Sequence, residues 1–92
     1  MVPKDTLVKA GVVDICLQLR NSDDPQSLEM LTEGASVTSS TVRNRANLLV
    51  EEGTLTEGSD LIEGSPTLVY ELTEEGEQDA EYIDLLVNRE VE

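Results

Sequence analysis

The chain lacks most of the groups on which enzyme chemistry depends. It contains no histidine and only one cysteine, so no Ser/His or Cys/His pair can form. A serine or cysteine nucleophile would have no histidine base, and any metal site would have to consist of carboxylates alone. Cys16 cannot form a disulfide within the chain, which agrees with a reducing compartment. We therefore predict no catalytic residue, no cofactor and no metal site, and we do not expect an enzyme.

Long apolar runs are also missing. The most apolar stretch, Val8 to Leu19, is interrupted by Lys9, Asp14 and Gln18. It is shorter than the roughly 20 apolar residues that a membrane span needs, and it does not have the form of an export signal. The sequence therefore predicts a cytoplasmic protein without a membrane partner.

Positive charge is scarce. The chain has twenty acidic and six basic residues, which give a net charge of -14, and it has no Phe or Trp. Such a surface is typical of proteins that work in molar salt, where the Debye length falls to roughly 3 Å and distant carboxylates barely repel DNA. Composition alone would favour an acidic protein that avoids nucleic acid. The placement of the bases opposes that reading, because Arg43 and Arg45 are the only ones between Asn21 and Asn88.

A helical apolar pattern between Ser27 and Leu55 breaks once, near Gly34, and then resumes. This is typical of a helix-turn-helix, expected at about residues 25–52. We predict that Asp24 and Pro25 begin the first helix, which runs to about Thr32. The second helix is expected to be capped by Thr38 and to run to Glu52, before Gly53. Its inward face consists of Val42, Ala46 and Leu49.

The outward face of this second helix is polar and is the predicted DNA-binding site. Arginine can bond guanine and asparagine can bond adenine through two atoms each, so we expect Arg43 and Asn44 to contact bases and Arg45 to contact phosphate. Helix capping explains the hydroxyl groups equally well, and the arginines could instead be paired with nearby acids. The candidate residues are Ser39, Ser40, Thr41, Arg43, Asn44, Arg45 and Asn47.

After this helix, the pattern predicts a wing at about residues 54–72. One strand starts at Leu55, residues 58–66 form a loop and residues 68–72 form the second strand. Thr73 can cap a last helix at about residues 74–88. Residues 57–66 contain three acids and no base, so contact between the wing and DNA is in doubt.

The segments STVRNRANLLVEEGTL and YELTEEG, in this order and spacing, resemble winged helix-turn-helix transcriptional regulators. The segment SPTLVYELTEEG is most similar to the HxlR-like branch, followed by MarR-like and ArsR-like regulators. The resemblance covers residues 6–88, and the acidic composition suggests a haloarchaeal or haloviral type. Thr67 stands where the HxlR-like pattern has an arginine. In such regulators the last helix pairs with the first helix of a second subunit.

The chain is short enough to be a single domain, residues 1–92, with a modest core that association would stabilise. A first helix from Thr6 to Arg20 is expected to be apolar almost all round, which a single copy could not cover. The residues predicted to form the dimer interface are Val13, Leu17, Ala80, Ile83 and Val87.

The sequence thus predicts an α+β, mostly α, winged helix-turn-helix fold with a three-helix core, a two-stranded wing and a C-terminal dimerisation helix. The expected function is that of a homodimeric regulator of transcription that binds double-stranded DNA. The alternative is a winged-helix module that binds proteins and not DNA. The acidic wing and the pair Leu61-Ile62 favour the alternative.

Overall fold

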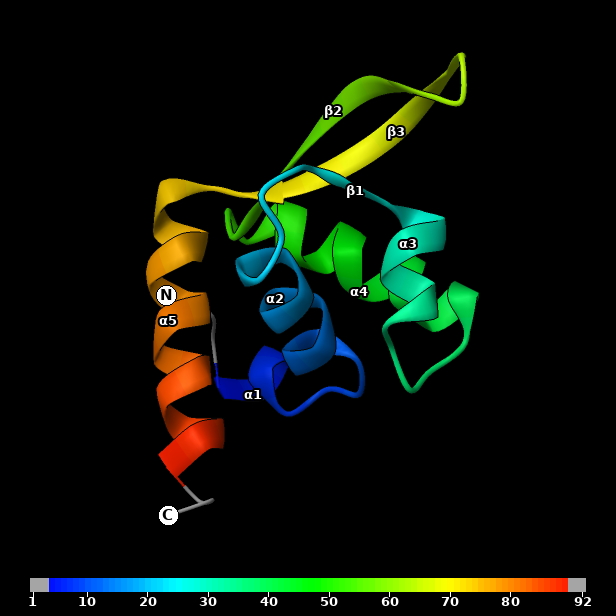
Figure 1. The fold of residues 1–92 in the computed structure, drawn as a ribbon. Coiled ribbons are helices and arrows are strands. Elements are labelled where there is room, and N and C mark those ends of the chain that lie inside the picture. Colours follow the sequence, from blue (N-terminus) through cyan, green and yellow to red (C-terminus); the bar gives the residue numbers. More distant parts are fainter. Residues whose placement is uncertain (1–3, 90–92) are drawn as a thin grey trace.

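The computed structural model describes residues 4–89, which form a small α+β fold of five helices and one three-stranded antiparallel sheet (Figure 1). The fold class predicted from the sequence is confirmed. The β2–β3 hairpin projects from the body, and α5 lies beside α2 on the other side (Figure 1). The elements are α1 (Lys4–Leu7), α2 (Val12–Arg20), β1 (Gln26–Ser27), α3 (Leu28–Glu33), α4 (Ser39–Glu51), β2 (Leu55–Ile62), β3 (Ser65–Leu72) and α5 (Glu74–Arg89).

One hydrophobic core holds these elements together. It is formed mainly by α2, α4 and α5, with Leu31 from α3 and residues at the base of the sheet. Fully burying one such aliphatic side chain contributes about 1.5–3 kcal/mol, so the core fixes the orientation of each helix. The buried residues of the three main helices are Val12, Ile15, Cys16, Leu19, Val42, Ala46, Leu49, Ala80 and Ile83.

The first helical segment is interrupted, so the expectation of one helix from Thr6 to Arg20 is wrong. Gly11 adopts a left-handed conformation with φ 92°, and α2 starts only after it. A side chain at Gly11 would also crowd Val37, whose Cγ2 lies 3.0 Å from the position of an added Cβ. Glycine tolerates both constraints, and it lets α1 and α2 follow different directions.

The start of α3 also differs from the prediction. Residues 26 and 27 form β1, which pairs with Tyr70 and Val69 of β3, and the helix begins after Ser27. The Ser27 hydroxyl accepts a hydrogen bond from the Met30 amide at 3.2 Å and caps the helix. Asp24 and Pro25 are therefore in the preceding loop, because the short strand takes the residues expected to form the first turn.

Two other helix starts agree with the sequence. Thr38 caps α4, its hydroxyl accepting from the Thr41 amide, and Gly53 after the helix is left-handed with φ 83°. The Thr73 hydroxyl accepts from the Gly76 amide at 2.9 Å at the start of α5 and also bonds the Gly53 carbonyl oxygen at 2.6 Å. Thr73 thereby ties the end of the sheet to the end of α4.

The wing is more regular than expected. Strands β2 and β3 pair without interruption from Leu55 opposite Leu72 to Ile62 opposite Ser65, so most of the expected loop at 58–66 is strand. Only Glu63 and Gly64 connect the strands, with φ values of 53° and 83°. Two residues with positive φ form a type I′ turn, whose twist matches that of paired strands. Backbone pairing, rather than burial, shapes this hairpin.

None of the helices within residues 4–89 is long and apolar enough to cross a membrane.

Candidate nucleic-acid interface

Helix α4 carries the predicted DNA-binding residues and is held by its inner face. Val42, Ala46 and Leu49 are completely buried in the core. These positions recur on one side of a helix, so residues on the other side must face outward. The core thus fixes which side chains of α4 can reach another molecule.

Most of the predicted residues are exposed on this outward side. The hydroxyl and amide groups there can donate to and accept from base edges. Thr41 and Arg45, by contrast, are half-buried. The exposed residues are Ser39, Ser40, Arg43, Asn44 and Asn47.

The structure brings part of this set together in one shallow hollow. Four residues of α4 line it with Leu28 of α3, which places an apolar side chain beside hydroxyl, amide and guanidinium groups. Leu28 is half-buried at the start of α3, which leaves part of its side chain available, and the sequence analysis did not place it in the site. The hollow has a volume of about 270 Å³, and its other lining residues are Ser39, Ser40, Arg43 and Asn44.

The two arginines of α4 have different environments. Arg43 is exposed and lies near Tyr70 of β3, where its positive charge lowers the pKa of the phenol. Burial and the charge of Glu57 act in the opposite direction and prevail, so the pKa of Tyr70 is raised. Arg45 instead donates from Nε to the carbonyl oxygen of Ala10 at 3.0 Å. Arg45 therefore also anchors α4 to the turn before α2, a role that the sequence did not indicate.

The hydroxyl groups at the start of α4 bond one another. Thr38 donates to the Thr41 hydroxyl at 3.1 Å, and the hydroxyls of Thr38 and Ser40 are 3.3 Å apart. Part of this hydroxyl cluster thus serves the helix start, as the capping interpretation proposed. Ser39 has an exposed side chain at the same end of the helix.

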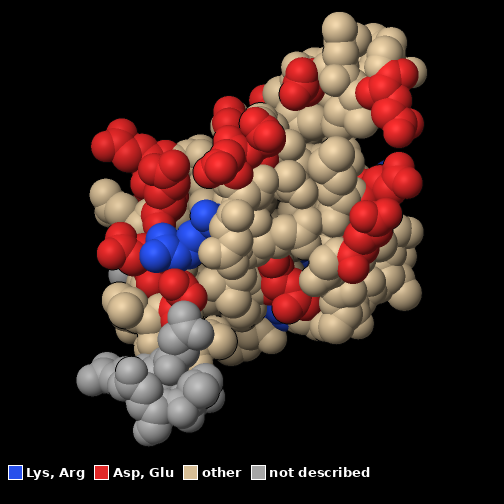
Figure 2. Space-filling view, in the orientation of Figure 1, with Lys and Arg blue, Asp and Glu red and all other residues tan. Residues whose placement is uncertain are grey.

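Among the charged residues of the chain, acids outnumber bases by twenty to six. Figure 2 shows acidic side chains from the hairpin to α5 and few basic atoms on the same face. Arg20 on α2 is 3.2 Å from Asp84 on α5 and is thus engaged within the chain. The wing carries Glu57, Asp60, Glu63 and Glu71 and has no base between its two ends. Arg43 and Arg45 thus give α4 two positive charges that would attract phosphates, while the acidic wing would repel them.

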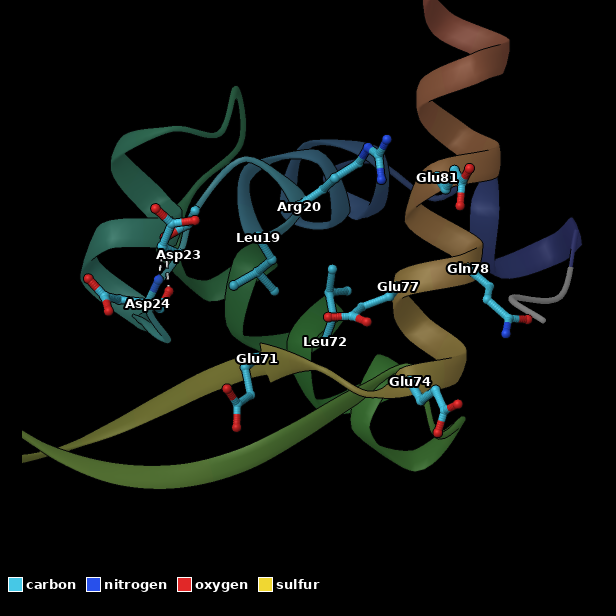
Figure 3. Close-up of a pocket in the computed structure, with 11 residues that line it drawn as sticks. Leu19, Arg20, Asp23, Asp24, Glu71, Leu72, Glu74, Glu77, Gln78 and Glu81 are labelled. Atoms are coloured by element: carbon cyan, nitrogen blue, oxygen red, sulfur yellow. Dashed lines mark hydrogen bonds between the residues drawn. The ribbon is translucent and has the colours of Figure 1, made fainter.

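A larger hollow, of about 420 Å³, lies between the end of α2, the following loop, the end of β3 and α5 (Figure 3). Leu19 and Leu72 form its apolar part, and Arg20 of α2 lines its edge with its side chain extending toward α5 (Figure 3). Its negative charge opposes phosphate binding. Within residues 4–89, no group of three or more potential ligands could hold a metal ion, and this includes the hollow. The carboxylates that line it are Asp23, Asp24, Glu71, Glu74, Glu77 and Glu81.

The predicted dimerisation residues differ in burial and form three groups. Ala80 and Ile83 are 0% and 3% exposed and lie in the core of this chain, so they are not surface residues. Val13 and Leu17 are half-buried and pack against the same core. Val87 is 41% exposed. The exposed apolar face of α5 also includes three residues outside the predicted set, Tyr82, Leu85 and Leu86.

No protein-family model matches the sequence, and comparison with curated proteins gives no significant match. Solved structures with a similar fold include a possible HxlR family transcriptional factor from Thermoplasma volcanium, with a TM-score of 0.81 and 21% identity over 92% of this chain and 74% of that one. YodB from Bacillus subtilis, in a diamide-treated form, has a TM-score of 0.66 and 18% identity over 96% of this chain and 90% of its own.

PadR from B. subtilis, solved in complex with operator DNA, has a TM-score of 0.64 and 22% identity. The match covers 77% of this chain and 44% of PadR. At these identities the shared property is the winged-helix fold.

Proposed function

We propose that this chain is a sequence-specific, duplex DNA-binding regulator of transcription that acts as a homodimer in the cytoplasm of a salt-loving microbe or its virus. The observation that carries the proposal is the outward face of α4, where exposed Arg43 and Asn44 lie beside Leu28 in one hollow. The fold that presents them is similar to that of PadR, which was solved in complex with operator DNA.

In this proposal α4 enters the major groove. Arg43 bonds guanine and Asn44 bonds adenine, each pair contributing about 1–3 kcal/mol of discrimination between bases. Leu28 and the hydroxyls of Ser39 and Ser40 contact neighbouring bases or backbone. Asn47 lies further along the same face. The wing is expected to contribute little, because its charge repels phosphates.

Arg45 has a mixed role in the proposal. Its Nε is bonded to Ala10, which leaves the terminal nitrogens to contact phosphate at the edge of the interface. Thr41 is half-buried next to it in the helix and supports the helix start more than it contacts DNA.

Selection of duplexes from a random-sequence library in molar KCl tests this function. We expect enrichment of a short, two-fold related sequence, because a symmetric dimer binds two half-sites. Arg43→Ala and Asn44→Ala should each relax preference at one position of the half-site, whereas Arg45→Ala should weaken binding to all sequences.

The matched control is Arg20→Ala, which removes the same charge from α2 and should leave the selected sequence unchanged. If wild type enriches no duplex, or if Arg43→Ala retains every base preference, the DNA-binding proposal is wrong. The protein-interaction alternative would then take its place.

The dimer part of the proposal is supported by the apolar face of α5. Tyr82, Leu85 and Leu86 are 51%, 62% and 40% exposed, and their spacing places them on one side of the helix. A second copy would cover this face, with Val87, Val13 and Leu17 at its edge. Exposed apolar patches of this kind mark contact sites.

Light scattering at micromolar concentration in molar KCl tests the assembly. We expect the mass of two chains for wild type and of one chain for Leu85→Glu. Thr56→Glu adds the same charge to an exposed position on β2 and should remain dimeric. A wild-type mass of one chain would contradict the dimer and leave DNA binding by α4 to be judged separately.

A further inference from the structure

The wing carries an apolar patch that the DNA-binding proposal does not use. Leu61 lies opposite Pro66 across the hairpin, and Leu68 follows Pro66 by two residues. Residues directly opposite, and residues two apart on a strand, share a face of the sheet. These three residues, here called the wing patch, therefore form one apolar surface. Leu61 and Leu68 are 69% and 50% exposed, and Pro66 is exposed too.

The wing patch continues the core side of the sheet beyond the core. Tyr70, on the same face two residues after Leu68, is buried against the helices. Strand β1 pairs only with Val69 and Tyr70, and past this point the hairpin projects away from the body (Figure 1). Within the described residues, the leucines thus lie where the body of the chain gives them little cover.

The hairpin holds the patch in a fixed arrangement. The strands are paired up to Ile62 opposite Ser65, and the type I′ turn at Glu63 and Gly64 closes them without extra residues. A preformed surface loses less conformational freedom when it binds. Pro66 has no amide hydrogen, which blunts the outer edge of β3 against addition of another strand. Binding through side chains is therefore favoured.

The charge around the wing patch limits what can cover it. Glu57, Asp60 and Glu63 lie on the same hairpin, which carries no base. Nucleic acid and anionic membranes would be repelled. A second copy of this chain would bring a net charge of -14 and few bases to the contact. Opposite charge has to come from another kind of molecule.

We propose that the wing patch is a docking site for a protein segment that has apolar side chains flanked by Lys or Arg. Leu61 and Leu68 provide the apolar contact, while Glu57 on the same face, Glu63 in the turn and the other carboxylates of the hairpin select a basic partner and disfavour acidic ones. The proposal does not depend on DNA binding by α4. In this proposal the acidic residues of the wing bind a basic partner and do not contact phosphates.

A random peptide library displayed on phage tests this site. Peptides are selected on the wild-type chain and depleted on the double variant Leu61→Thr, Leu68→Thr, which keeps residues that favour strands. We expect the selected peptides to carry net positive charge and at least one large apolar residue. A synthetic peptide of the selected sequence should bind the double variant about tenfold or more weakly.

The matched control is Val8→Thr, which removes an exposed apolar side chain in the turn after α1, away from the wing. It should bind the selected peptide like wild type. Amide chemical shifts of the wild-type chain should change at residues 59–61, 67 and 68 on adding the peptide, a readout that does not depend on how the double variant folds.

Several results would overturn the proposal. These are a selection without enrichment, selected peptides that are acidic, and shifts confined to α5. Wing shifts that follow protein concentration alone would indicate a second copy as the occupant. Wing shifts on adding a duplex of random sequence, with none on adding peptide, would indicate a DNA contact.

Discussion

The hydroxyl of Thr6 in α1 donates a hydrogen bond of 2.6 Å to Oε2 of Glu52, the C-cap residue that follows α4. Thr6 is 3% exposed, and within the described part of the chain the other carboxylate oxygen of Glu52 is buried without a hydrogen-bond partner. The short first helix thus supplies a donor to one oxygen of a half-buried carboxylate 46 residues further along the chain. This bond connects the start of the fold to the helix that carries the candidate site.

We therefore expect Thr6→Val to lower the free energy of unfolding by about 1–3 kcal/mol, because it leaves a buried acceptor without its donor while keeping the side-chain shape. Urea denaturation at constant salt measures the change. Thr56→Val, at an exposed position of β2, is the control and should be nearly neutral. Equal stability of Thr6→Val and wild type would mean that water replaces the bond.

Gly76 in the first turn of α5 should not accept a side chain. An added Cβ would collide with the carbonyl oxygen of Thr54, which is backbone and cannot move away easily. Alanine in a helix normally gains about 1 kcal/mol over glycine, but overpacking costs about 1–3 kcal/mol, so we expect Gly76→Ala to be destabilising. Gly58→Ala provides the control, since its Cβ would make an ordinary contact of 3.8 Å with Val69. A thermal midpoint of Gly76→Ala at or above that of wild type would contradict the close approach of Gly76 to the Thr54 carbonyl oxygen.

Cys16 should be chemically inert in the folded chain. Burial, aided by the negative charge of Asp79, raises the pKa of its thiol to about 12. Since the thiolate is the reactive form, we expect alkylation at pH 8 only after denaturant is added. Mass spectrometry of iodoacetamide-treated protein gives the answer. Labelling of native protein as fast as unfolded protein would exclude a buried thiol.

The same shift predicts a loss of stability at alkaline pH. The unfolded thiol ionises near pH 9, but the folded thiol stays protonated to about pH 12, so the folded state binds more protons in this range. The contribution of this thiol to the free energy of unfolding should consequently be fully present below pH 9 and should decrease as the pH rises above it. Cys16→Ala should show a smaller decline. The raised pKa of Tyr70 acts in the same direction and should persist in that variant.

Salt should stabilise the protein. Twenty acids and six bases on a chain of 92 residues repel one another unless cations screen them. We expect the thermal midpoint, followed by circular dichroism, to rise from dilute buffer toward molar KCl. A midpoint that stays constant over this range would refute the halophilic interpretation, although it would not affect the fold.

Local signals in the sequence predicted the parts of the fold that local interactions determine. Thr38 and Thr73 start helices because their hydroxyls bond the following amides, and Gly53 ends one through its positive φ. The break at Gly11 was missed, because apolar residues continue across it and the close approach of Val37 comes from a part of the chain distant in sequence.

Strand β1 was missed for a related reason. Its two residues are defined by pairing with Val69 and Tyr70, which are distant in sequence. In the candidate site, too, the sequence predicted what local periodicity determines and missed what a distant contact determines. Helical periodicity correctly placed Arg43 and Asn44 outside, whereas the bond from Arg45 to Ala10 depends on where the turn before α2 lies.

Ala80 and Ile83 are buried within a single chain, so the core of this chain forms without a second copy. Helix α5 is held on α2 of its own subunit, so two copies could part without opening either core. In the homodimer proposed above, subunits built in this way would be exchanged between dimers while folded, and by mass action the melting temperature would rise with protein concentration. A cell that holds related chains could thereby form mixed pairs without unfolding any of them.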